Sequence, residues 1–117
     1  MIDINELRLG NWVDNVGDKE YVTALAVNFL ATNGQIGIDI EKVYPIPLTP
    51  DILEKCGFRY MEELNGLHYK GHVVFKTISG DWIIDIERKG LLINIYTLHQ
   101  LQNLYFALTG DELQINW

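Results

Sequence analysis

Two histidines lie four residues apart in the segment His68-Tyr69-Lys70-Gly71-His72. On a helix this spacing would place both imidazoles on one face, where they could share a metal ion. The Lys70-Gly71 pair instead favours a turn, and a zinc site needs three or four ligands. His99 is the only other histidine, and its place in the first turn of a predicted helix directs it toward solvent. We therefore expect exposed hairpin histidines and no metal site.

Three carboxylates, Asp81, Asp85 and Glu87, follow one another along a predicted strand and the turn before it. Asp85 and Glu87 are two positions apart and project from the same face, an arrangement suited to acid–base chemistry or to a hard cation. Charges on the solvent face of a half-buried antiparallel strand have the same pattern. The first interpretation describes a small hydrolase; the second, which we favour, describes ordinary surface charges.

Cys56 is the only cysteine, which excludes an intramolecular disulfide and a cysteine metal cluster. It lies at the end of a short predicted helix, where the helix dipole raises the pKa of a thiol, so we expect a small core residue and not a nucleophile. The sequence also has no Gly-x-Gly-x-x-Gly, Walker A, Gly-x-Ser-x-Gly or His-Glu-x-x-His motif. We expect a protein that is not an enzyme, with no catalytic residues, no cofactor and no metal.

The charge balance is sixteen acidic against nine basic side chains, a formal net charge of −7 with a pI near 4.7. A nucleic-acid partner is not expected, because no basic stripe is present to neutralise phosphates. Thirteen aromatic residues could stack bases on a strand face, but such sites also need a positive groove. The acidic surface either keeps the protein soluble or mimics DNA and docks onto a basic partner.

The chain has no window of 18 uninterrupted apolar residues, so no membrane partner is expected. The first six residues lack the basic and apolar regions of a signal peptide. With a lone cysteine, these features indicate a cytoplasmic protein.

With 117 residues, the chain fits a single compact domain spanning residues 1–117. Three prolines within Pro45-Ile46-Pro47-Leu48-Thr49-Pro50 predict a stiff extended crossover. This crossover divides the domain into a β-rich first part, residues 1–47, and a second part, residues 48–117.

The first part predicts a helical turn at residues 5–10 and five short strands. The strands are expected at residues 11–14, 20–26, 27–32, 35–40 and 42–46. Asn33-Gly34 is a strong hairpin signal, and Ile36, Ile38 and Ile40 alternate with polar residues as on a half-buried strand. Short strands with tight turns after Leu7-Arg8-Leu9-Gly10-Asn11-Trp12-Val13 are similar to an SH3-like small β-barrel.

The second part predicts a helix, a meander and another helix. Thr49, Pro50 and Gly57 mark the ends of a two-turn helix. The meander consists of strands at residues 72–78, 82–87 and 91–95. Thr97 and Gln100 form a capping box for a helix over residues 98–109 that Gly110 ends. Its expected apolar stripe, packed on the meander sheet, is Leu98, Leu101, Leu104, Tyr105 and Leu108. The fold class is therefore α+β.

Leu113, Ile115 and Trp117 alternate with Gln114 and Asn116, the period of a half-buried strand. We expect a short edge strand that pairs with its own sheet or with a neighbouring molecule as a homodimer.

Two long segments carry a family resemblance. The segments Pro45–Phe58 and His99–Leu113, together with Glu6–Val13, resemble small uncharacterised proteins encoded by phages, prophages and mobile elements of gut-type bacteria. The resemblance implies an accessory protein of the bacterial cytoplasm and brings no activity or site residues with it. The sequence thus predicts a non-enzymatic interaction protein with a protein partner. The alternative is a nucleic-acid or nucleotide-binding module that uses the SH3-like part.

Overall fold

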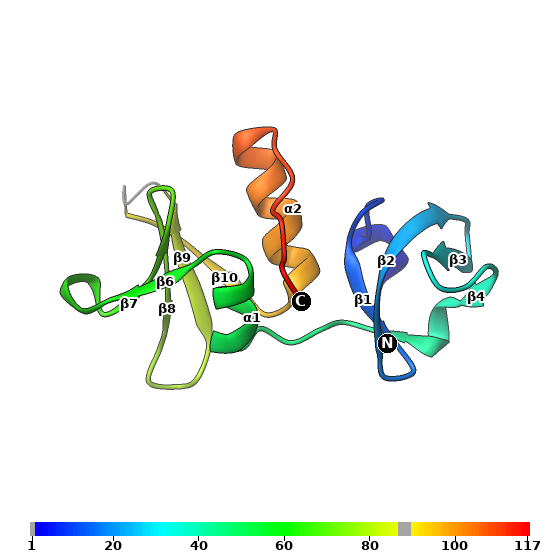
Figure 1. The fold of residues 1–117 in the computed structure, drawn as a ribbon, viewed down its shortest axis with the longest axis horizontal. Coiled ribbons are helices and arrows are strands. Elements are labelled where there is room, and N and C mark those ends of the chain that lie inside the picture. Colours follow the sequence, from blue (N-terminus) through cyan, green and yellow to red (C-terminus); the bar gives the residue numbers. More distant parts are fainter. Residues whose placement is uncertain (1, 87–89) are drawn as a thin grey trace. The chain divides into compact units, whose positions relative to one another are not determined.

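The computed structural model describes residues 2–86 and 90–117 as two compact units, each with a five-stranded antiparallel sheet (Figure 1). Unit 1 comprises Met1–Pro47 and Thr97–Asp111, and unit 2 comprises Leu48–Tyr96 and Glu112–Trp117. The fold class is α+β, as predicted. The boundary after Pro47 coincides with the predicted division of the chain, but the last helix belongs to unit 1.

Unit 1 contains one sheet with the strand order β4-β3-β2-β1-β5. Its elements are η1 (Ile4–Glu6), β1 (Trp12–Asn15), β2 (Asp18–Leu25), β3 (Phe29–Thr32), β4 (Ile38–Asp39), η2 (Ile40–Lys42), β5 (Val43–Tyr44) and α2 (Leu98–Thr109). Five strands appear where the sequence predicts them, although β4 and β5 are each only two residues long. Among the described residues no pairing joins β4 to β5, so the hydrogen-bonded sheet is open and the predicted barrel is not closed.

The β1–β2 connection is the tightest hairpin of unit 1. Asn15 pairs with Asp18, and the two loop residues Val16 and Gly17 both have positive φ, 51° and 91°. This is the geometry of a two-residue hairpin loop, which glycine adopts freely and a β-branched residue adopts at a cost. The strands were expected at residues 11–14 and 20–26, so the connection is shorter than the sequence predicted.

The Asn33-Gly34 hairpin exists, but its geometry differs from the prediction. Residues 33–37 all lie in the connection between β3 and β4, and positive φ occurs at Gly37. Asn33 instead accepts a hydrogen bond at Oδ1 from the Tyr21 amide, at 2.9 Å. Because the connection is longer than two residues, Ile36 leaves the strand and is 88% exposed, whereas Ile38 is buried as expected.

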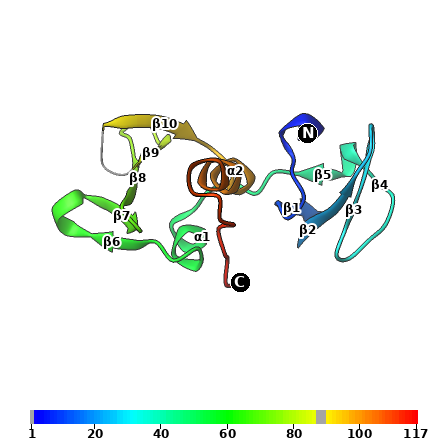
Figure 2. The ribbon, with the colours of Figure 1, turned by 90° about the horizontal axis from the view of Figure 1, so that it is seen from above.

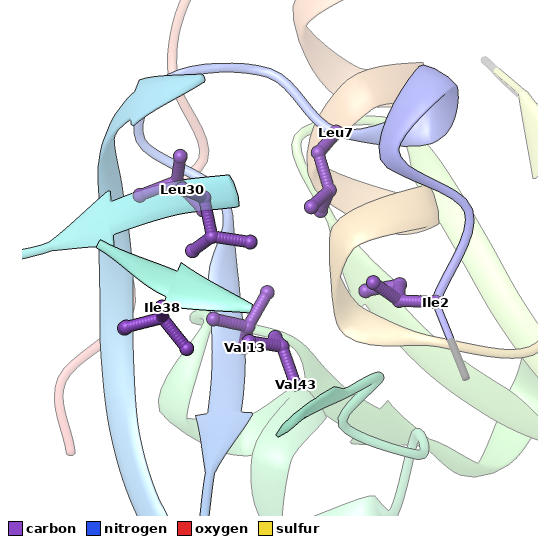
Figure 3. Close-up of a cluster of buried hydrophobic side chains, with 7 residues drawn as sticks. Ile2, Leu7, Val13, Leu30, Ile38 and Val43 are labelled. Atoms are coloured by element: carbon purple, nitrogen blue, oxygen red, sulfur yellow. The ribbon is translucent and has the colours of Figure 1, made fainter. Parts of the chain in front are cut away.

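The core of unit 1 lies on one face of the sheet. It consists of Ile2, Leu7, Val13, Val22, Leu30, Ile38 and Val43. Figure 3 shows Ile2 and Leu7, which flank η1, and side chains from the strands converging on this cluster. Since side chains alternate along a strand, Trp12, Tyr21, Phe29 and Ala31 occupy the opposite face, called here the outer face.

Unit 2 contains a meander with the strand order β10-β9-β8-β7-β6. Its elements are α1 (Pro50–Lys55), β6 (Arg59–Met61), η3 (Glu62–Leu64), β7 (Gly66–Tyr69), β8 (His72–Lys76), β9 (Trp82–Ile86) and β10 (Leu91–Ile95). The three predicted strands are present within the described residues, and β6 and β7 are additional. Trp82, Ile84 and Ile86 are buried on one face of β9, as the alternation predicts.

Helix α1 begins and ends as predicted. Thr49 Oγ1 accepts a hydrogen bond from the Ile52 amide at 3.2 Å, and Pro50 occupies the first turn. Gly57 follows with φ of 102°, and a Cβ there would lie 2.8 Å from the Tyr69 ring. Ile52 and Leu53 are buried, so this short helix depends on packing for its stability.

Helix α2 has the predicted capping box at Thr97 and Gln100, and it ends at Gly110. Its buried face is different from the predicted stripe: the buried residues are Leu98, His99, Leu101, Gln102 and Tyr105. Leu104 is half-buried, and Leu108 is 44% exposed. The helix was predicted to pack on the meander sheet, but it belongs to unit 1, where it contacts β1.

The segment Glu112–Trp117 is not a strand, so the predicted C-terminal edge strand is wrong. The segment is nevertheless held within unit 2, because Leu113 is buried and the Asn116 amide donates to the Lys55 carbonyl at 2.9 Å. The Lys55 ammonium also lies 5.9 Å from the centre of the Trp117 ring. The alternation arises from irregular chain with one anchored leucine, and the homodimer expected through this segment has no strand to form it.

Across the described ranges, no helix has both the length and the apolar character needed to cross a membrane.

Candidate interaction surface

The histidine motif forms the turn of a hairpin. Lys70 and Gly71 have φ of 48° and 88° between β7 and β8, and Tyr69 pairs with His72. His68 Nε2 accepts a hydrogen bond from the Gly71 amide at 3.1 Å. His68 is half-buried and His72 is 4% exposed, so the prediction of exposed histidines is wrong. Within residues 2–86 and 90–117, no three His, Cys, Asp or Glu side chains group as metal ligands.

The carboxylates Asp81 and Asp85 stabilise turns. The Ser79 hydroxyl lies 3.4 Å from Asp81 Oδ2, and the Asp81 amide donates to Thr77 Oγ1 at 3.1 Å. Asp85 Oδ1 accepts a hydrogen bond from the Gly90 amide at 3.0 Å. Glu87, the third member of the predicted set, lies outside the described residues. These bonds give Asp81 and Asp85 structural partners in the turns before and after β9.

Cys56 is 3% exposed, and its burial raises the pKa of the thiol to about 12. The direction agrees with the prediction, although desolvation and not the helix dipole is the cause. A thiol with this pKa is protonated at neutral pH, which suits a core residue.

His99 is 2% exposed, which contradicts its predicted place toward solvent. Its Nδ1 lies 3.1 Å from Thr97 Oγ1, and its Nε2 has no hydrogen-bond partner among the described residues. Burial lowers the pKa of His99, while the charge of Glu6 acts in the opposite direction.

Two amide side chains of α2 bind the chain around the start of β1, and we call this group the polar clasp: Arg8, Asn11, Gln102 and Asn103. Gln102 Oε1 accepts from the Trp12 amide at 2.9 Å, and Gln102 Nε2 donates to the Gly10 carbonyl at 3.2 Å. Asn103 Oδ1 accepts from Asn11 Nδ2 at 2.8 Å and from Arg8 Nε at 3.2 Å. The clasp therefore joins parts of unit 1 that are about 90 residues apart in sequence.

The Arg8 guanidinium also lies over the Phe106 ring, 4.3 Å from its centre. The clasp consists of buried or half-buried groups with structural partners, so it anchors α2 and offers no open site. Sequence reasoning missed it, because the amides of α2 look like solvent-facing helix residues.

Unit 1 has a shallow apolar groove at the end of the β2–β3 hairpin, with a volume of about 190 Å³. It is lined by Ala24, Leu25, Ala26, Phe29, Leu30, Ala31 and Gly37, and we call it the apolar groove. Ala24 pairs with Ala31 across the two strands, so two small side chains leave the hollow that Phe29 borders. Phe29 is 52% exposed.

Negative charge adjoins the apolar groove. Asp39 on β4 pairs directly with Phe29, and residues directly opposite each other in an antiparallel pair share a face. Asp39 Oδ1 accepts a hydrogen bond from the main-chain amide of a second acidic residue, Glu41, at 3.0 Å. Unit 1 contains eight acidic and three basic side chains, so it carries most of the net negative charge of the protein.

Comparisons of the chain with known protein families, with curated proteins and with solved structures found no match.

Proposed function

We propose that this chain is a non-enzymatic interaction protein that binds a protein partner through the apolar groove of unit 1. The observation that carries the proposal is the exposure of Phe29 and Leu25 beside the small residues Ala24 and Ala31. Exposed apolar hollows on soluble proteins commonly mark sites of protein contact. An aromatic side chain at the border supplies the kind of anchor that dominates binding energy at interfaces.

The partner that fits this surface is a peptide segment with an apolar side chain next to Lys or Arg. The apolar side chain fills the hollow between the alanines, and the cation pairs with Asp39 beside Phe29. The net negative charge of unit 1 favours the approach of such a segment and opposes nucleic acid. The groove is too shallow to enclose a drug-sized ligand, because such ligands occupy pockets of about 300–1,000 Å³.

We further propose that unit 1 is related to SH3-like folds. The order of its elements supports this proposal. Strands β1 to β4 form a meander, a 3₁₀ turn follows at η2, and the last strand, β5, returns to pair with β1. Folds of this kind host many unrelated functions, so the site carries the functional argument. The resemblance of three sequence segments to proteins of phages and mobile elements supports an accessory role in the bacterial cytoplasm.

Selection of peptides from a random library on the immobilised protein tests the proposal. We expect enrichment of peptides in which Lys or Arg adjoins an apolar or aromatic residue, with affinity that falls as salt is raised. Phe29→Ala should weaken binding about tenfold or more, since truncating an aromatic anchor costs about 2 kcal/mol or more and about 1.4 kcal/mol is tenfold in affinity. Tyr44→Ala is the matched control, because Tyr44 is a similarly exposed aromatic on β5, outside the groove.

Failure to enrich any peptide above background would refute the proposal. Equal binding by the Phe29→Ala and Tyr44→Ala variants would place the binding site elsewhere. A gel shift with short DNA or RNA at low salt would instead support the nucleic-acid alternative.

A further inference from the structure

The free edges of the two sheets differ in how they resist pairing with another chain. Natural sheets protect their edges with short strands, charged side chains, prolines or bulges. In unit 1 both edge strands, β4 and β5, are only two residues long. In unit 2, the edge strand β6 has three residues, begins with Arg59 and is followed by Glu62 and Glu63. These three edges are protected.

The remaining edge strand, β10, has none of these protections within the strand. It lies at the outer side of the meander, next to β9 (Figure 2). Its five residues, Leu91–Ile95, pair with β9 in an unbroken register from Ile86 to Trp82. The strand is therefore regular, and its other side offers main-chain donors and acceptors to a further strand.

Two apolar side chains of β10, Leu92 and Ile93, are exposed, one on each face of the strand, whereas Ile95 is buried. Leu92 is 58% exposed and Ile93 is 39% exposed, and they point to opposite faces because side chains alternate. Asn94, the only polar side chain of the strand, is also exposed. A strand with this pattern gains both hydrogen bonds and apolar burial when another strand pairs with it.

Charge identifies the partner as a second copy of the same chain. No Asp, Glu, Lys or Arg occurs from residue 90 to residue 110, although the protein carries a net charge of −7. In a two-fold symmetric antiparallel pair residue i of one copy faces residue j of the other and j faces i, and the residue on the axis faces its own equivalent, so a charge at or near the axis would lie close to a like charge. A neutral strand avoids this repulsion, and it offers no charge pattern that would select a different acidic or basic partner.

We propose that two copies of the chain associate through antiparallel pairing of β10 with β10, which joins their meanders into one continuous sheet. A symmetric register centred on Ile93 places Ile93 opposite its own equivalent and Leu92 opposite Asn94 of the other copy. This association is independent of the apolar groove, which lies in unit 1.

Sedimentation velocity over a hundredfold range of concentration tests the proposal. The wild type should convert from monomer to dimer as concentration rises, and salt should favour the dimer because it screens the repulsion between two acidic chains. Ile93→Lys should weaken the dimer about tenfold or more, because two like charges then meet at the two-fold axis. Ile78→Lys is the control, since Ile78 is fully exposed on the β8–β9 connection of the same unit.

A charge-pairing experiment keeps the test specific. A mixture of Ile93→Lys and Ile93→Glu should recover a heterodimer, because opposite charges meet only if the two Ile93 positions face each other. Circular dichroism checks that each variant is folded, and Leu92→Lys replaces Ile93→Lys if the latter unfolds. A wild type that stays monomeric at every concentration and salt would overturn the proposal, as would a dimer that Ile93→Lys leaves unchanged.

The test of dimerisation and the test of peptide binding give independent results. Salt weakens the proposed peptide complex and strengthens the proposed dimer. The Ile93→Lys variant should retain peptide binding, and Phe29→Ala should retain dimerisation.

Discussion

Replacing Gln102 by leucine removes the central member of the polar clasp. The Gln102 side chain is 2% exposed and satisfies two main-chain groups, the Trp12 amide and the Gly10 carbonyl. Leucine has a similar length but can neither accept nor donate a hydrogen bond. In the Gln102→Leu variant both main-chain groups therefore lose their side-chain partner in a place with little access to water.

The magnitude follows from these two lost bonds. A buried main-chain group left without a partner costs about 1–3 kcal/mol, so the pair costs about 2–6 kcal/mol. Burial of the leucine side chain returns about 1.5–3 kcal/mol. Taking the middle of each range, a loss of about 4 kcal/mol against a return of about 2, we expect the free energy of unfolding to fall by about 2 kcal/mol, a sizeable part of the roughly 5–15 kcal/mol typical of a domain.

Urea denaturation monitored by tryptophan fluorescence and by circular dichroism measures this change. Gln114→Leu is the matched control, because Gln114 is exposed and its substitution should change the free energy of unfolding by less than about 0.5 kcal/mol. If Gln102→Leu is as stable as this control, water or a shifted main chain satisfies the two groups, and the clasp does not stabilise unit 1.

Three further predictions concern stability. Leu101→Ala should lower the free energy of unfolding by about 2–5 kcal/mol, because Leu101 is fully buried. Leu104→Ala should lower it clearly less, because Leu104 is half-buried. Equal losses in thermal unfolding would mean that the buried face of α2 is assigned wrongly. Since the pKa of His99 is lowered in the folded state, the unfolded state binds its proton first as pH falls below about 6.5, so stability should decrease there by at most about 1.4 kcal/mol per pH unit. His99→Gln should remove this part of the pH dependence of unfolding, and an unchanged profile would exclude His99 as its source. Val16→Asn should raise the free energy of unfolding by about 0.5–1 kcal/mol, because asparagine tolerates a φ of 51° better than valine, and Val27→Asn, at an equally exposed position without positive φ, should leave it unchanged.

Local sequence signals predicted the ends of elements well. The caps of α1 and α2 are short-range hydrogen bonds between neighbouring residues, so Thr49, Thr97 and Gly110 were sufficient to locate them. The alternation along β9 predicted its buried face for a similar reason, since a single period of two describes a half-buried strand.

The errors arise where distant parts of the chain decide the outcome. The buried face of α2 includes His99 and Gln102, because Gln102 binds main-chain groups about 90 residues earlier in the sequence. The C-terminal alternation was interpreted as a strand, but a period of two does not determine which main chain the segment pairs with, and the segment is instead held by Lys55. The apolar groove was missed because two alanines and a phenylalanine on a strand have the same sequence pattern whether they are covered or exposed.

Most of unit 2 is inserted within the sequence of unit 1, so the ribosome synthesises unit 1 in two pieces separated by Leu48–Tyr96. On the ribosome, all five strands of the first sheet are made by Tyr44, but Gln102 follows Pro47 by 55 positions. At translation rates of about 5–20 residues per second, this delay lasts about 3–11 seconds. During that interval the Trp12 amide and the Gly10 carbonyl lack Gln102 as a partner and must be hydrated. The residues of β6 to β10 are also synthesised before unit 1 is complete, because its last segment, Thr97–Asp111, follows them in the sequence. A nascent chain that stops within the second sheet therefore carries every strand of the first and still lacks the helix that completes it.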